Sequence, residues 1–255
     1  MPTFETHYAS FAGTLDKYYI PNHVHFVVDG DAAVFLDLRA DQYRMLVGEK
    51  ARAFGSLLSR ARDPTRRVIA VDRRASAESL TVTDTLLGEL FAHKLLTRTP
   101  SEALRPCIYI PPPEDSFIDS QDPEPPAVGL RDILRFLWCW LLASCRLRFA
   151  TIESIVTAVA RRNRMQGTEH SFDFGKARRL VRVYYRLRPF LPVSYMCLYD
   201  SLIMLNFLAQ YGCRPHWVFA VRLEPWEAHC WVQYGSVAFN EETDRARTFL
   251  PIMMI

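Results

Sequence analysis

Three side chains of the C-terminal half have the types and the order of a cysteine nucleophile system. Cys197 begins an apolar helical stretch within LPVSYMCLYDSLIMLNFLAQYGC, His229 lies on the strand-like segment AHCWV, and Glu241 follows in FNEE. A thiolate attacks carbonyl carbons, a histidine carries the proton, and an acid or amide orients the imidazole. The sequence therefore points to acyl-transfer chemistry.

The nucleophile needs help from its surroundings, because a free thiol is mostly protonated at neutral pH. Pro192 and Ser194 indicate a helix start, which places Cys197 in the first turn, where unpaired N–H groups and the helix dipole favour negative charge. His229 is the expected base. Glu241 is expected to fix the imidazole tautomer, with Asn240 as the alternative.

Each of these residues has a plainer interpretation by itself. A single cysteine is more often a buried hydrophobe than a nucleophile, and a single histidine in a sheet is more often a satisfied structural side chain. Only the combination and its order favour catalysis. The set Cys213, His216, His229 and Cys230 matches no closed zinc spacing, so neither a metal nor another cofactor is expected.

The composition predicts a folded chain with no special partner class. Hydrophobic residues make up 49% of the 255 residues, and the net charge of +3 comes from 31 basic and 28 acidic side chains, a balance that does not favour nucleic acid. The longest apolar run, 136–145, is half of the roughly 20 residues a membrane span needs. No secretory signal is visible at the N-terminus, so we expect a cytoplasmic protein that does not bind a membrane.

A stretch rich in proline and acids divides the chain. Eight of the 16 prolines fall between Pro100 and Pro126, and such a composition favours an extended connector. We predict a domain at 1–99, a linker at 100–128 and a second domain at 129–255.

The first domain is predicted to be a small three-strand, three-helix module of winged-helix type. Alternating apolar residues flank the turn Asp29-Gly30 and indicate a hairpin, and a third strand is expected at 42–46. Helical spacing follows at 54–58, and a last helix capped by Thr83 or Asp84 carries an apolar stripe. That helix offers two acids and one lysine, which disfavours DNA binding. An open sheet edge is better suited to an added peptide strand.

The second domain is predicted to be α+β. Helices are expected near 129–145, 149–162, 172–188 and 194–211. The arginines of the third, up to Arg188, are interpreted as a solvated face, with contact to an acidic partner as the alternative. Strand-like segments follow to the end of the chain, which indicates an antiparallel sheet packed on the helices.

These segments resemble a known family. FLPVSYMCLYDSLIMLNFLAQYGCRPHWVFAV, EAHCWVQYGSVAFNEE and FLPI are similar to the lasso peptide biosynthesis B protein, a leader peptidase of the transglutaminase-like (papain-like) cysteine peptidase superfamily. The resemblance covers 129–255. It implies Cys197 as nucleophile, His229 as base and Glu241 as orienting acid, in place of the family's aspartate. The family's alanine after the histidine is Cys230 here, which we interpret as a packing change.

The N-terminal module resembles the PqqD-like recognition element that grips the leader of ribosomally made, modified peptides. The resemblance implies that the leader lies along the third strand and packs against the last helix. The candidate leader-binding residues are Gln42, Tyr43, Arg44, Leu87 and Phe91. The implied partners are a precursor peptide and an asparagine-synthetase-like lasso cyclase.

The resulting hypothesis is cleavage of a leader from its core peptide through a thioester on Cys197. Two alternatives remain. The same triad could pass its acyl group to an amine, as an acyltransferase or transglutaminase does, and an added amine in the product would reveal it. A non-catalytic scaffold that binds leader and cyclase would bind the leader without cleaving it.

Overall fold

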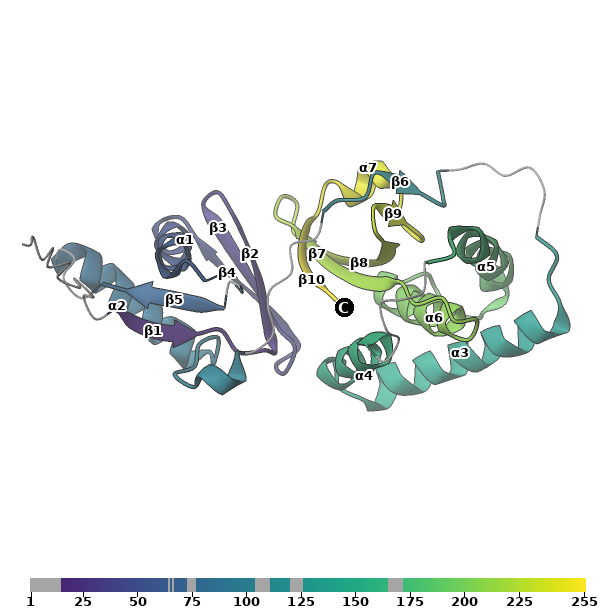
Figure 1. Cartoon of the computed structure of the whole chain (residues 1–255), viewed down its shortest axis with the longest axis horizontal. Helices are drawn as coiled ribbons and strands as arrows, with labels where there is room; N and C mark the ends of the chain where they lie inside the picture. The colour runs from purple at the N-terminus through teal and green to yellow at the C-terminus, as the bar shows by residue number, and fades with distance from the viewer. Residues whose placement is uncertain are drawn as a thin grey trace, which may run out of the picture. The chain divides into compact units, whose positions relative to one another are not determined.

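The computed structural model describes residues 15–63, 65, 67–72, 77–103, 111–119, 126–164 and 172–255. The predictions that concern the first residues of the chain, Cys107 and parts of the proline-rich linker lie outside this range. Contacts divide the chain into two compact units, one of which holds the described residues from 111 onward together with 23–27 and 34–45. Figure 1 shows the elements of the N-terminal part in purple and blue and those of the C-terminal part in teal to yellow.

Residues 15–103 contain two small sheets and two α-helices in their described part. The elements are β1 (Asp16–Tyr19), β2 (Val24–Asp29), β3 (Ala32–Asp37), β4 (Gln42–Val47), α1 (Glu49–Ala61), β5 (Val68–Val71) and α2 (Ala77–Ala92). Strands β2, β3 and β4 form one sheet in that order, and β1 pairs antiparallel with β5. The predicted hairpin and third strand are confirmed, whereas the winged-helix type stays a prediction.

The last predicted helix of this part begins earlier than its expected cap. Thr83 and Asp84 lie inside α2, which starts at Ala77. Threonine and aspartate favour caps because their side chains compete for backbone groups. Here the helix continues through both residues, and the neighbouring Thr85 Oγ1 donates to the Thr81 carbonyl at 2.9 Å, within the helix. The buried stripe of Leu86 and Leu90 then holds these polar residues in helical conformation.

The C-terminal part contains the predicted helices. They are α3 (Leu130–Phe149), α4 (Ile152–Arg164), α5 (Phe174–Leu187), α6 (Cys197–Ala209) and the short α7 (Thr243–Ala246). In α3, Phe136, Cys139 and Ala143 are buried at helical spacing, and the Gly129 N–H donates to the Asp132 carboxylate at 3.1 Å. No helix in the described residues combines the length and the apolar character needed to cross a bilayer.

A five-stranded sheet lies beside these helices. Its strands are β6 (Asp115–Ser116), β7 (His216–Arg222), β8 (Glu227–Tyr234), β9 (Val237–Ala238) and β10 (Leu250–Met254), in the order β10-β7-β8-β9-β6. Four strands are antiparallel, as predicted, and β6 pairs parallel with β9. The part of the chain from 111 onward is therefore α+β.

Helix α6 is the centre of this half of the molecule. It contacts α3 and α5 on one side and β7 and β8 on the other, and Figure 1 shows it between α3 and the sheet. Residues 199–208 are buried all round the helix, as expected of a helix with neighbours on every face. The first residue of this rigidly packed element is Cys197.

Strand β6 belongs to the segment predicted as linker. The Phe117 N–H donates to the Ala238 carbonyl at 3.0 Å, and the Phe117 ring stacks on Phe239 with the ring centroids 4.7 Å apart. Two paired residues among prolines and acids give no periodic signal, so the sequence did not predict this strand. It holds the chain just before the predicted acid, Glu241.

Candidate active site

The sulfur of Cys197 lies at the N-terminus of α6. The residue is half-buried, and Met196, immediately before it, has an extended backbone. The Met196 N–H donates to the Asp200 carboxylate at 2.8 Å, which satisfies one donor at the helix start. The helix thus begins three residues later than Ser194 and places the thiol closer to the positive end of the helix dipole than predicted.

His229 lies on β8 and is buried beside the acid. Its pairing with Ala220 of β7 fixes the backbone, and its Nε2 atom contacts a carboxylate oxygen of Glu241. The imidazole also hydrogen-bonds the side chain of Cys197, and Nδ1 is the ring nitrogen left for that bond. The three predicted residues therefore meet in the order thiol, imidazole, carboxylate.

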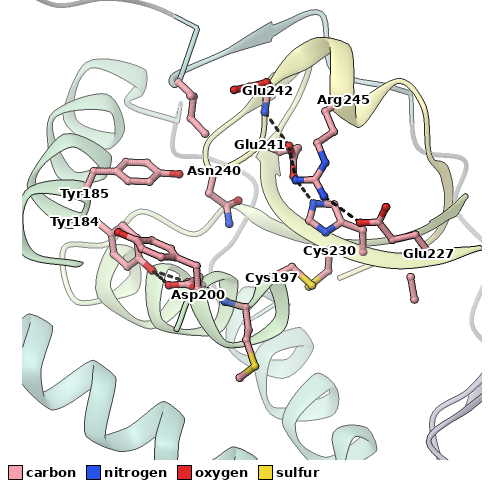
Figure 2. A pocket seen from close by; sticks show the side chains of 15 residues that line it. Tyr184, Tyr185, Cys197, Asp200, Glu227, Cys230, Asn240, Glu241, Glu242 and Arg245 are labelled. Atoms are coloured by element: carbon pink, nitrogen blue, oxygen red, sulfur yellow. Dashed lines mark hydrogen bonds and ion pairs between the residues drawn. The ribbon is translucent and has the colours of Figure 1, made fainter. Parts of the chain in front are cut away.

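Glu241 is held by several contacts of its own. Its Oε1 atom accepts from the Glu242 N–H at 3.1 Å and lies 3.7 Å from Nη1 of Arg245, while its backbone carbonyl accepts from Ser116 Oγ at 2.6 Å. Figure 2 shows Arg245 beside the carboxylate, where it also pairs with Glu227. These contacts hold the carboxylate in place beside the imidazole.

Asn240, the alternative orienting residue, makes its side-chain hydrogen bonds to other groups than the imidazole. Its Oδ1 atom accepts from the Val232 N–H at 2.7 Å, and its Nδ2 atom donates to Ser201 Oγ at 3.0 Å. Both halves of the amide thus tie the loop to β8 and α6. Of the two candidates, Glu241 is the one that contacts the imidazole.

The electrostatics of the site favour a thiolate and an imidazolium. The pKa of Cys197 is lowered to about 4, chiefly by a hydrogen bond from Cys230. Burial opposes this shift, and His229 reinforces it. Burial disfavours charge on the imidazole, but its bonds to Cys197 and Glu241 outweigh that effect and raise the pKa of His229 to about 9. Between these values the resting site is an ion pair whose sulfur is ready for attack.

A buried ion pair fixes the segment that precedes the nucleophile. Arg188, in the 3-10 turn Arg188–Phe190, is 1% exposed and contacts the Asp200 carboxylate. Its Nη1 and Nη2 atoms donate to the carbonyls of Val193 and Ser194 at 3.1 and 2.9 Å, and Tyr184 donates to Asp200 at 2.9 Å. The interpretation of Arg188 as part of a solvated face is wrong, because it lies past the end of α5 and turns inward.

The site opens into a pocket of about 510 Å³. Besides the three predicted residues it is lined by Tyr185, Tyr195 and Met196, of which Tyr195 and Met196 are exposed at 63% and 59%. The hydroxyl of Tyr185 points into this space (Figure 2). No group of three or more His, Cys, Asp or Glu side chains suited to a metal ion occurs in the described ranges.

The candidate leader-binding residues lie on two elements. Gln42, Tyr43 and Arg44 belong to β4, one of the two edge strands of its sheet. Leu87 and Phe91 belong to α2, where Leu87 is a core residue and Phe91 packs edge-on against Tyr18 with centroids 5.4 Å apart. Among the described residues β4 pairs with β3 alone, so its other edge fits the expectation of strand addition. The Tyr43 ring, however, packs edge-on against Trp226 with the centroids 5.8 Å apart, and the buried Leu87 side chain is not at the surface.

The comparison with family models decides the class of the C-terminal part. Residues 139–254 match the model of the transglutaminase-like superfamily. This part of the chain is a transglutaminase-like domain. The searches of curated proteins and of solved structures gave no match. The superfamily typically contains enzymes of the cysteine protease type, so the transglutaminase-like half of the sequence resemblance is confirmed, and the lasso family and the recognition element stay predictions.

Proposed function

We propose that the protein is the leader peptidase of lasso peptide maturation. The observation that carries the proposal is the contact series from Cys197 through His229 to Glu241, in an open pocket of a transglutaminase-like domain. The narrower assignment to lasso peptides rests on the resemblance of the motifs and of the N-terminal module.

The chemistry follows from the positions of the three side chains. The Cys197 thiolate attacks the carbonyl carbon of the last leader residue, and the backbone N–H of Cys197, unpaired at a helix start, donates to the oxyanion. The His229 imidazolium gives its proton to the departing amine of the core peptide, which leaves a thioester on the sulfur. His229 then takes a proton from water, and the hydroxide releases the leader as a carboxylate. Glu241 orients the ring throughout.

The N-terminal part supplies the recognition in this proposal. An extended leader adds to the free edge of β4 by backbone hydrogen bonds, with side chains such as Tyr43 and Arg44 beside it. Joining the recognition element to the peptidase raises the local concentration of the cleavage site. The freed core amine then passes to an asparagine-synthetase-like cyclase.

Mass spectrometry of the precursor peptide after incubation with the full chain tests the proposal. We expect a leader and a core fragment from the native protein and intact precursor from Cys197→Ala. Cys145→Ala, which removes an exposed thiol on α3, is the matched control and should cleave normally. Cleavage by Cys197→Ala would overturn the proposal.

A second candidate is amine acyl transfer, which the superfamily match favours because the same triad can release its acyl group to an amine. The same incubation with a primary amine in excess distinguishes the two. A leader fragment heavier by the amine, minus water, indicates transfer, whereas a free carboxylate indicates hydrolysis.

A further inference from the structure

A second thiol lies against the nucleophile. Cys230 follows His229 on β8, and its side chain is 3% exposed. It hydrogen-bonds the Cys197 side chain and lines the same pocket. Figure 2 shows the two cysteine side chains pointing toward one another. The sequence interpretation of Cys230 as a packing residue did not foresee this contact.

The direction of the hydrogen bond follows from the two environments. Cys197 starts a helix and faces an imidazolium, which both favour the thiolate. Cys230 is enclosed between β8 and α6, and burial raises its pKa well above the usual range, so it keeps its proton. The bond therefore runs from the Cys230 S–H to the Cys197 sulfur.

The backbone holds Cys230 at this position. Its pairing with Phe219 of β7 fixes the strand, and its carbonyl accepts from Ser201 Oγ, on α6, at 3.3 Å. The backbone N–H of Cys230 also donates to the Cys197 sulfur. A substitution of the side chain leaves that second donor in place, so the contribution of the thiol can be measured separately.

We propose that Cys230 is a further catalytic residue, whose thiol donates a hydrogen bond to the Cys197 sulfur and stabilises it as the attacking thiolate. The inference rests on the proposed function only in taking Cys197 as the nucleophile. His229 supplies the proton for the leaving group, and Cys230 supplies a fixed, uncharged donor on another side of the sulfur. No proton leaves Cys230 during the reaction.

Alkylation of Cys197 by iodoacetamide tests the inference without any peptide substrate. The rate is followed against pH, and the modified residue is identified by mass spectrometry. In Cys230→Ala we expect the midpoint of the pH profile to rise by about one to two pH units, since a hydrogen bond to an ionised group is lost. In Cys230→Ser, which keeps a hydroxyl donor, the midpoint should stay close to the native value.

The other ionisable groups around the sulfur are the same in every variant, so a shift reports the thiol. Around the pocket they are Tyr184, Tyr185, Tyr195, Asp200, Glu227, His229, Glu241, Glu242 and Arg245, and Tyr43 also interacts with both thiols. Cys213→Ala, which removes another buried cysteine outside the pocket, is the matched control and should leave the midpoint unchanged. Thermal unfolding of each variant identifies any loss of fold.

An unchanged midpoint in Cys230→Ala would overturn the inference, and so would an equal rise in the alanine and serine variants, which indicates packing alone. The outcome is independent of leader cleavage. If the native protein fails to cleave a precursor while the Cys230→Ala shift is observed, the proposed function is wrong and the role of Cys230 stands. If cleavage occurs without the shift, the reverse holds.

Discussion

The His229 imidazole lies between Cys197 and Glu241, and this arrangement sets the pH range of the proposed reaction. Attack needs the Cys197 thiolate, and expulsion of the amine needs the His229 imidazolium. Both exist together only between the two pKa values, whereas a neutral thiol and imidazole would need a proton transfer before attack.

We therefore expect a bell-shaped dependence of kcat/KM on pH. The acid limb rises as Cys197 ionises, with a pKa of about 4, and the alkaline limb falls as His229 loses its proton, with a pKa of about 9. Steady-state cleavage of a leader peptide across this range measures both limbs. A profile that rises only near the usual thiol pKa would contradict a resting ion pair.

Glu241→Gln keeps the size of the orienting side chain and removes its charge. Because Glu241 raises the pKa of His229, the alkaline limb should move to lower pH, and kcat/KM should fall by about 100-fold through loss of imidazolium stabilisation. Glu242→Gln, which changes an exposed carboxylate on the same pocket wall, is the control. It should leave both the alkaline limb and kcat/KM unchanged. An alkaline limb that stays in place would argue against Glu241 as the orienting acid.

Among single residues, the sequence predicted those whose side-chain type alone indicates a chemical role. Cys197, His229 and Glu241 were predicted from their identity and order, and the geometry brings them together. The roles of Cys230 and Arg188 were not predictable in the same way. Each depends on which side chain a distant element places beside it, and neither spacing nor periodicity carries that information.

Among the elements, the short strand β6 has the most direct link to the site. Ser116 is buried, donates to the Glu241 carbonyl at 2.6 Å, and accepts from the Ile118 N–H at 3.1 Å. One hydroxyl thus connects two backbone groups, and one of them belongs to the orienting acid.

Ser116→Ala leaves both backbone groups unpaired. We expect the free energy of unfolding to fall by about 1–3 kcal/mol and kcat to fall with it, since Glu241 loses part of its support. Urea denaturation and steady-state kinetics measure the two effects. Ser154→Ala, an exposed serine on α4 with a local bond only, is the control. Normal kcat in a destabilised Ser116→Ala protein would show that β6 does not position the acid.

The elements themselves were predictable in proportion to their length. Helices α3, α4 and α5 have buried residues at regular spacing, and their predicted ranges agree with the structure within a few residues. The start of α2 was predicted too late because Thr83 and Asp84 resemble caps. Strand β6 was missed because its pairing partner, β9, lies more than a hundred residues away.

For the whole molecule, we propose that the N-terminal part recognises the leader and the C-terminal part cleaves it. The division predicts that leader affinity and chemistry can be altered separately.

Tyr43→Ala on β4 should weaken binding of a fluorescently labelled leader about tenfold, the cost of one good side-chain contact. At saturating precursor, kcat should fall less than the affinity does, because the imidazolium is retained, although Tyr43 also interacts with the Cys197 thiol. Arg60→Ala, an exposed residue of α1, serves as the control. Fluorescence anisotropy gives the affinity, and unaltered binding by Tyr43→Ala would remove this residue from the proposed leader site.

The pairing of β6 with β9 also bears on how the protein can be divided into separate polypeptides. The Pro111 carbonyl accepts from Gln233 and the Pro113 carbonyl accepts from Arg247, so these prolines are part of the C-terminal fold rather than a spacer in front of it. A fragment that starts at α3, the first helix of the C-terminal part, lacks β6, whose Ser116 donates to the Glu241 carbonyl. Any split of the two activities into two genes must therefore cut upstream of Pro111.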